Sequence, residues 1–392
     1  MKIRSNGVNN AAKKNSGILA KAGNRPFFDF LTARNEYAII HVTGYFTMTK
    51  RSSSVTIRDV ARQAGVSVAT VSRYLNQNAP VSDTLSQRIQ QVMETLDYVP
   101  EATARQLALG KKHTIGLLLT NLHNDFFAPL LAGIEGVVSE RGYNLLVATH
   151  RADSHNEVQF PLGTHNTDGL LVFADSLTDE RIAQFHNRHL PLVLIHKTPL
   201  PDLSIPFVTV ENKAASRKLV DHLITVHGCG RIILMRGPSR QEDSYWREVG
   251  YKAALADHGL PFDEALVLQG SFEREKAYNA LKTFLANPNH PDFDAVFAGD
   301  DDAAIGIYDA LREAGLRIPQ DVAVVGFDDS RMAPFLTPPL TTVRAPTEEV
   351  GRSAAQHLFR LLEGEMPELA TVHATEMIIR HSCGCHDQPD LP

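Results

Sequence analysis

Residues 67–76 carry the most specific chemistry in the sequence. The guanidinium of Arg73 can donate two parallel hydrogen bonds to the O6 and N7 atoms of one guanine, and such a pair discriminates against other bases by about 1–3 kcal/mol. Val68 and Ala69 have no hydrogen-bonding group in their side chains, so they can offer only apolar contact, for example to a thymine methyl. Together these side chains are suited to reading the edges of base pairs.

Two short helices around a tight turn would present these side chains. The first is predicted at 56–64, with Thr56 as its N-cap. Its apolar face would consist of Ile57, Val60, Ala61 and Ala64. Gly65 follows as a C-cap that can enter the left-handed region, and Ser67 can cap a second helix with Val68, Val71 and Leu75 on its apolar side. This is the layout of a helix-turn-helix, whose second helix enters the DNA major groove.

A third helix is predicted at 82–96, packed on the first two, with Pro100 ending the unit. Its apolar stripe would be Leu85, Ile89, Val92, Met93 and Leu96. Short polar side chains around this unit are suited to phosphates, which position a protein without reading sequence. Besides Val68, Ala69 and Arg73, we expect DNA contacts from Thr56, Ser67, Thr70, Ser72, Asn76, Ser82 and Tyr98. Helix packing and capping remain an alternative role for Thr70 and Ser72, as does a solvated surface position for Arg73.

Composition predicts a soluble chain of two or three domains. Its 392 residues are 43% hydrophobic and 21% charged, as in ordinary globular proteins. No apolar run approaches the roughly 18 residues of a transmembrane helix, and the start lacks the pattern of a secretory signal. Three cysteines do not make a disulfide framework, so we expect a reducing, cytoplasmic location.

Charge is distributed unevenly along the chain. Lys and Arg exceed Asp and Glu by five in residues 1–47 and by four in residues 48–113, which leaves −15 for residues 114–392. A basic front end on an acidic body suits a protein that touches a polyanion at one end only. Residues 1–47 show no clear period. We expect disorder there, or a start-site artefact with translation beginning at Met48; the rival is a basic arm that adds phosphate contacts.

The remainder of the chain alternates between apolar strands and amphipathic helices. Strands are predicted at 115–120, 143–149, 169–173, 191–195, 208–210, 231–235, 265–269, 295–298, 322–326 and 340–343. Such alternation predicts an α/β fold with doubly wound parallel sheets, and the number of strands suits two lobes. Ligands of these folds bind outside the carboxyl ends of the strands, so a cleft between facing lobes is the expected pocket.

Ordered motifs along most of the chain resemble one family. They include TIRDVARQAGVSVATVSRYLN from 56, LDYVP from 96, ATARQLALGKKHTIGLLL from 102, GDDDAAIG from 299, IPQDVAVVGFDD from 318 and PPLTTVRAP from 338. These resemble the lactose-repressor (LacI/GalR) family of transcriptional regulators over roughly residues 54–384. The resemblance implies an all-α helix-turn-helix headpiece and a two-lobed body like a periplasmic binding protein, with chain crossings that we expect near 208–212, 326–330 and 340–346.

Domain limits follow from the motifs and the resemblance. We expect an N-terminal extension at 1–53, the DNA-binding headpiece at 54–100, a hinge helix and linker at 101–113, the effector-binding and dimerisation body at 114–385 and a tail at 386–392. Residues 151–169 are shorter than the corresponding segment of relatives and contain Pro161 and Gly163, so the helix there should be truncated or distorted.

The hinge is the second DNA element that the resemblance implies. Leu107 matches the leucine that wedges into the minor groove, where an apolar side chain unstacks a base step and bends the duplex. Arg105 is placed to approach phosphates or the groove. Glu101 stands where relatives mostly have asparagine, and its carboxylate would repel phosphate. The alternative for Leu107 is a linker leucine packed on the body.

A small-molecule effector site is also implied by the resemblance. Asp301 would accept hydrogen bonds from ligand hydroxyls, Arg247 would donate to the ligand, and Phe272 and Phe126 would cover the two faces of a ring. Weaker candidates are Gln241, Asp243 and Asp328. The alternatives are a helix N-cap for Asp301, core packing for the phenylalanines and a surface ion pair for Arg247. Ligands of the family are usually sugars, sugar derivatives or purines.

The favoured function is therefore a sequence-specific regulator, most simply a repressor, controlled by a carbohydrate effector. A homodimer on palindromic double-stranded DNA is expected, because each headpiece reads one half-site. No phosphate loop, nucleophile elbow or zinc-protease helix is found, so we expect no catalysis and no cofactor. A sugar-binding protein or sugar-modifying enzyme without operator binding remains the alternative. Cys383, Cys385 and His386 could bind a metal, but a reduced tail is the favoured interpretation and no metal is predicted.

Overall fold

The computed structural model describes residues 55–76, 80–98, 112–123, 125–150 and 160–385. The predictions for residues 1–47 and for the hinge, including Arg105 and Leu107, lie outside these ranges. Within them, none of the helices has both the length and the apolar character needed to cross a bilayer.

Three helices form the headpiece as predicted. Helix α1 spans Ile57–Ala64, α2 spans Val68–Asn76 and α3 spans Asp83–Thr95. Gly65 has φ +63°, so it adopts the left-handed conformation that ends α1. The Ser67 hydroxyl oxygen accepts a hydrogen bond from the Thr70 amide at 3.1 Å, which confirms Ser67 as a cap of α2. The small core that joins the helices contains Val60, Ala61, Ala64, Val71 and Ile89, with Leu85, Val92, Met93 and Leu96 packed against it.

The first lobe is built on a six-stranded sheet in the order β11-β5-β4-β3-β1-β2, with every neighbouring pair parallel. Its strands are β1 Thr114–Leu119, β2 Asn144–Thr149, β3 Gly169–Phe173, β4 Leu192–Ile195, β5 Phe207–Val210 and β11 Ala370–His373. The central strands are buried on both faces, which explains their continuous apolar runs.

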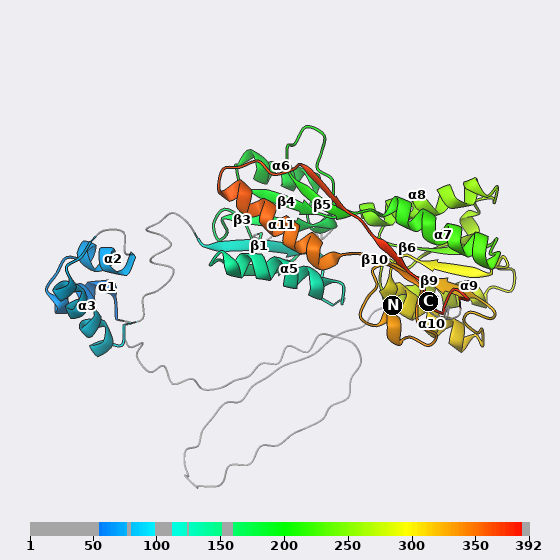
Figure 1. Ribbon diagram of the computed structural model, residues 1–392, viewed down its shortest axis with the longest axis horizontal. Helices are drawn as coiled ribbons and strands as arrows, with labels where there is room; N and C mark the ends of the chain where they lie inside the picture. Colours follow the sequence, from blue (N-terminus) through cyan, green and yellow to red (C-terminus); the bar gives the residue numbers. More distant parts are fainter. Residues whose placement is uncertain (1–54, 77–79, 99–111, 124, 151–159, 386–392) are drawn as a thin grey trace, which may run out of the picture. The chain divides into compact units, whose positions relative to one another are not determined.

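Helices cover both faces of this sheet. Helix α5 (Phe127–Glu140) and helix α11 (Thr347–Leu362) lie side by side on one face (Figure 1). The core of this lobe includes Leu117, Leu171 and Val193 from the sheet. Gly351 permits their close approach, because a Cβ there would lie 2.3 Å from the carbonyl oxygen of Leu130. Helix α6 (Asp179–Asn187) covers the other face, over a core that includes Leu170.

The second lobe repeats the design on a four-stranded parallel sheet in the order β7-β6-β8-β9. Its strands are β6 Ile232–Arg236, β7 Val267–Gln269, β8 Ala295–Ala298 and β9 Ala323–Val325. Helices α7 (Lys213–His227) and α8 (Glu242–Asp257) pack on one face; α9 (Arg274–Ala286) and α10 (Asp301–Glu313) pack on the other. The two doubly wound sheets confirm the predicted fold class.

The described residues also contain three short 3-10 helices. They are η1 (Ala174–Ser176), η2 (Glu264–Leu266) and η3 (Ala333–Phe335). Residues 160–168 form bends and turns, and residues 151–159 of the segment expected to hold a truncated helix lie outside the described ranges.

Two of the three predicted chain crossings are confirmed. The chain passes from β5 to α7 after residue 210, and from β10 (Thr342–Arg344) to α11 after residue 344. The crossing predicted at 326–330 is wrong, because the chain stays in the second lobe, where Ala333 and Leu340 pack in its core. The third crossing instead joins β11 to β12 (Glu376–Ile378), which pairs antiparallel with β10. Strands β11 and β12 were not predicted from the sequence because they are short and partly exposed, without a continuous apolar run.

Candidate functional site

A cavity of about 470 Å³ lies between residues of the two lobes, within the usual size of small-molecule sites. It is at the carboxyl ends of strands: Asn121 follows β1, Phe272 follows β7 and Asp300 follows β8. This is the position expected for a doubly wound fold. Six of the seven predicted effector residues line it, namely Phe126, Gln241, Asp243, Arg247, Phe272 and Asp328.

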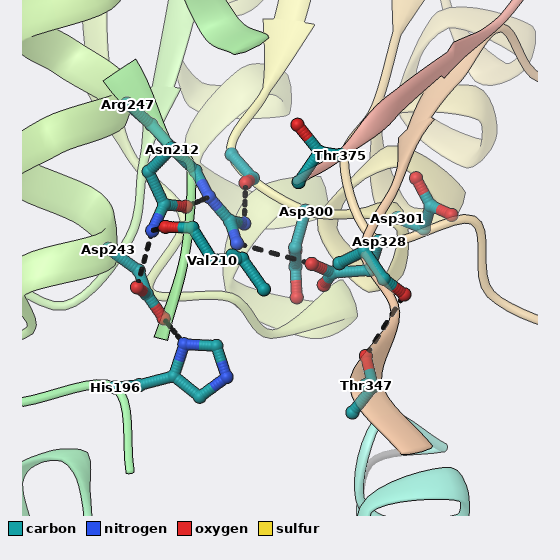
Figure 2. Close-up of polar contacts among 12 residues, drawn as sticks. His196, Val210, Asn212, Asp243, Arg247, Asp300, Asp301, Asp328, Thr347 and Thr375 are labelled. Carbon is teal, nitrogen blue, oxygen red and sulfur yellow. Dashed lines mark hydrogen bonds and ion pairs between the residues drawn. The ribbon is translucent and has the colours of Figure 1, made fainter. Parts of the chain in front are cut away.

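Arg247 is the centre of a buried polar network beside the cavity (Figure 2). Its guanidinium donates to Asn212 Oδ1 at 2.9 Å, to the Gly299 carbonyl at 2.6 Å and to Asp328 Oδ1 at 3.2 Å. The planar group also lies 3.7 Å from the centroid of the Phe327 ring. The arginine is thus held in one orientation from three sides, which is the preorganisation that a binding site needs.

Asn212 and His196 extend this network, although neither was predicted from the sequence. The Asn212 amide donates to Asp243 Oδ1 at 2.7 Å, and His196 Nδ1 lies 2.9 Å from Asp243 Oδ2 (Figure 2). Asn212 follows β5 and His196 follows β4, so both stand at carboxyl ends of strands. Because ligands of doubly wound folds bind at the carboxyl ends of strands, this position in the sequence could have identified both residues as candidates for the effector site.

Polar contacts also join the two lobes along one side of the cavity. Gln241 precedes α8 and donates to Asp175 Oδ1 of the first lobe at 3.0 Å. The Thr198 amide donates to Glu242 Oε1 at 2.9 Å. The contact between His196 and Asp243 likewise joins β4 to α8. These contacts hold the facing residues at distances that a small ligand can bridge.

Two aromatic groups supply the apolar surfaces. Phe272 and the preceding Ser271 both have φ +56°, so the loop after β7 turns sharply and places the ring over Gly237 and Gly299. Phe126, which precedes α5, lies 5.8 Å from the Phe173 ring, measured between centroids. Both phenylalanines line the cavity, and their role in covering a ligand ring stays a prediction.

Gly237→Ala is expected to weaken effector binding at least tenfold while leaving the fold intact. A Cβ at this position would lie 2.2 Å from the Phe272 ring, so the ring must leave the cavity wall. The affinity of the effector, measured by calorimetry, checks this. Gly136→Ala is the matched control, because a Cβ there meets nothing within 4 Å. Unchanged affinity in Gly237→Ala contradicts the role of the Phe272 ring.

The structure does not bring Asp301 to this cavity. Its neighbour Asp300 lines it and also caps α10, accepting from the Ala303 amide at 2.9 Å. Asp301 is buried and accepts from the Thr342 hydroxyl at 2.6 Å and the Ser330 amide at 2.7 Å. It lines an adjacent cavity of about 450 Å³, to which Asp300 and Asp328 also contribute. The residue that caps α10 is therefore Asp300 and not Asp301, for which a capping role was the alternative.

Helix α2 carries the side chains predicted to contact base edges, and they lie on its exposed side. Val68, Ala69 and Arg73 are exposed, whereas Val71 is buried in the headpiece core. Thr70 is half-buried, and its hydroxyl lies 2.8 Å from that of Ser67, the residue that caps α2. Ser82 is exposed directly before α3, Thr56 precedes α1, and Ser72 and Tyr98 are half-buried. The side chain of Asn76 lies outside the described residues.

Comparisons with known proteins identify both parts of the chain. A family described as "Bacterial regulatory proteins, lacI family" matches residues 56–101, and a "Periplasmic binding protein-like domain" matches residues 220–383. The ribose operon repressor of Escherichia coli is 35% identical over 303 residues, covering 76% of this chain and 90% of the relative. The chain belongs to the LacI family.

Further LacI-family relatives match along the same length. Catabolite control protein A of Priestia megaterium is 30% identical and covers 83% of this chain and 98% of the relative. A structure of the transcriptional regulator CelR in complex with cellobiose has a TM-score of 0.62 at 32% identity, covering 84% of this chain and 99% of that one. These relatives are regulators of transcription, and this LacI-family chain is likewise a DNA-binding regulator rather than an enzyme.

Burial sets the electrostatics of the cavity. It raises the pKa of Asp328 to about 6, although Arg247 opposes the shift. In the adjacent cavity, burial raises the pKa of Asp301 to about 7, with Asp328 adding to the effect. The pKa of Asp300 is raised well above its usual value by burial and by Asp328. Burial also acts to raise the pKa of Asp243, but His196, Arg247 and Asn212 outweigh it and lower the pKa.

Asp300→Asn is expected to raise the melting temperature more at pH 8 than at pH 5. Burial and the neighbouring Asp328 raise the pKa of Asp300 in the folded state, so this carboxyl takes up a proton on folding. Its stabilising contribution is complete below the unfolded pKa and is lost as pH rises through the folded pKa. Asparagine keeps the cap of α10 but removes a buried charge. Thermal unfolding at both pH values measures the difference.

Asp321→Asn provides a control of opposite sign. Hydrogen bonds from Arg317 lower the pKa of Asp321 to about 2, so its contribution is present at both pH 5 and pH 8. This variant should lose a little stability equally at both values. If Asp300→Asn raises the melting temperature equally at pH 5 and pH 8, burial of the charge is not the cause.

Proposed function

We propose that the protein is an operator-specific repressor whose DNA affinity is set by a neutral sugar or sugar derivative bound in the cavity beside Arg247. The observation that carries the proposal is the buried Arg247 network, because it supplies fixed donors and acceptors beside a cavity that Phe126 and Phe272 also line. Carboxylates and an arginine that bracket hydroxyls, with an aromatic face over the ring, are the groups that a sugar requires.

The charge of the cavity favours an uncharged ligand. Asp175, Asp243, Asp300 and Asp328 all contribute to its lining, whereas Arg247 is already paired within the network. Arg240 and Lys276 also line the cavity, but both are exposed, so a phosphate would meet these carboxylates without a basic partner of comparable burial. The names of relatives point the same way, since they refer to ribose and cellobiose. We therefore expect the effector to be a mono- or disaccharide without phosphate.

The proposed mechanism is a shift between two arrangements of the lobes. A ligand that contacts Phe126 on one lobe and Arg247 and Phe272 on the other binds more tightly when the lobes are closed. It can shift the equilibrium only by that difference in affinity. In a homodimer, such closure would change the distance between the two hinge segments and so the fit to a palindromic operator. The protein would act in the cytoplasm, where that DNA lies.

The domain limits remain part of the proposal: headpiece 54–100, hinge 101–113 and effector-binding body 114–385. Arg73 would read bases, Val68 and Ala69 would contact thymine methyls, and Arg105 and Leu107 would act in the hinge. We add Asp300 to the proposed effector residues because it lines the cavity. Asp301 stays among them, although its carboxylate accepts a hydrogen bond from Thr342.

A two-step experiment tests the proposal. Thermal-shift screening against unphosphorylated mono- and disaccharides identifies the effector, and gel-shift titration on DNA upstream of the protein's own gene then measures operator affinity with and without it. The expected result is a shift of at least tenfold in operator affinity. Tight sugar binding without any specific DNA binding would instead favour the alternative of a sugar-binding protein.

A further inference from the structure

Two histidines and two cysteines meet at the end of helix α7, away from the carboxylates of the cavity. His222 and His227 are in the last turns of α7, while Cys383 and Cys385 come from the segment that follows β12. One ligand atom from each of the four residues lies within 4.8 Å of all the others. No carboxylate is part of this cluster, which we call the Cys2His2 cluster.

We propose that the Cys2His2 cluster is a structural Zn²⁺ site. Zinc bound by thiolate and imidazole is tetrahedral, with Zn–S about 2.3 Å and Zn–N about 2.0–2.1 Å. These lengths place two nitrogens about 3.3 Å apart, and a nitrogen and a sulfur about 3.6 Å apart. The observed separation of His222 Nε2 and His227 Nε2 is 3.3 Å, and Cys385 Sγ lies 3.6 Å and 3.4 Å from them.

The backbone between the cysteines is shaped for this approach. Gly384 has φ +108°, a conformation that residues other than glycine rarely adopt. A Cβ at this position would lie 3.0 Å from Nδ1 of His227, so the glycine lets the backbone pack against the imidazole. Both sulfurs can therefore reach the same two rings from one short segment, with Cys383 buried and Cys385 half-buried.

Neighbouring groups hold the cysteine segment in place. The Thr341 hydroxyl donates to Cys383 Sγ at 3.2 Å, the type of outer contact that orients a thiolate ligand. Ser382 donates to the Val324 carbonyl at 2.6 Å and accepts from the Thr341 amide at 2.8 Å, which ties the segment to the edge of the second-lobe sheet. Two thiolates and two neutral imidazoles around Zn²⁺ also give no net charge, as a buried site requires.

Zinc at this position would fix the C-terminal segment to α7. Residues 222 and 385 are far apart in sequence, and a metal that closes so long a loop stabilises the folded chain. Helix α7 begins next to Asn212 of the effector network and ends at His227, about 22 Å away by the helical rise. The metal would therefore support the second lobe without touching the effector.

The full-length, untagged chain provides the test. After purification under reducing conditions and removal of metal with a chelator, it is titrated with Zn²⁺ alone, and bound zinc is measured by mass spectrometry. One zinc per chain is expected, with a rise of several degrees in melting temperature. Co²⁺ should give the absorption bands of a tetrahedral ion together with thiolate-to-cobalt charge transfer.

Variants locate the ion. Cys385→Ser and His227→Gln should each lose the thermal shift and the tetrahedral Co²⁺ spectrum, with circular dichroism confirming that the chain is folded. Cys229→Ala and His258→Gln are the matched controls, because neither residue belongs to the cluster, and both should keep one zinc. Three results would overturn the proposal: substoichiometric zinc in the reduced wild-type chain, full zinc retained in both cluster variants, or a Cys383–Cys385 disulfide that forms in place of metal uptake.

Discussion

Arg247→Ala is expected to abolish effector control and to lower the free energy of unfolding by about 3–5 kcal/mol, the usual loss when one partner of a buried ion pair is removed. The side chain of Arg247 is only 5% exposed, and its removal leaves Asp328 and Asn212 without their donor. Effector affinity should fall at least 100-fold, as measured by calorimetry, while denaturant unfolding measures the stability.

Operator binding separates this variant from a merely unfolded one. Arg247 lies in the body, so Arg247→Ala should still bind its operator at temperatures where it is folded, but without a response to the effector. Arg217→Ala is the control, because the Arg217–Asp257 pair is on the surface of the same lobe and should be worth about 0–1 kcal/mol. Near wild-type effector affinity in Arg247→Ala would remove this residue from the proposed site.

Arg73→Ala is expected to destroy sequence discrimination while leaving weak, salt-sensitive DNA binding. Loss of one bidentate guanine contact costs about 1–3 kcal/mol in each half-site. Since a dimer uses two half-sites, specific affinity should fall between about 30-fold and about 20,000-fold. Contacts to phosphates do not depend on Arg73, so affinity for random DNA should remain and should still fall steeply with salt. Gel-shift titrations on operator and random duplexes measure both quantities.

Arg62→Ala is the matched control for this effect. Arg62 is exposed on α1, where it pairs with Asp59 at 2.6 Å. Its substitution removes the same charge from the headpiece as Arg73→Ala. It should weaken operator and random DNA alike, if at all. An unchanged ratio of operator to random affinity in Arg73→Ala would mean that other residues of α2 read the bases.

The sequence by itself determined the features that depend on local interactions. Gly65, Ser67 and the apolar stripe of α3 define the headpiece because caps, turns and helical periodicity involve residues a few positions apart. The apolar runs of the buried strands predicted the parallel sheets in the same way. The resemblance then indicated six of the residues that line the cavity, including Arg247 and Phe272.

Only the tertiary structure decided which distant groups meet. Asp300 and Asp301 are identical neighbours, yet successive residues at a helix start point about 100° apart, so one lines the main cavity and the other faces Thr342. His196 and Asn212 acquire their roles through contact with α8, and β11 is a strand because it pairs with β5. The Cys2His2 cluster joins residues 163 positions apart. Such contacts depend on how whole elements pack, and no local pattern in the chain encodes them.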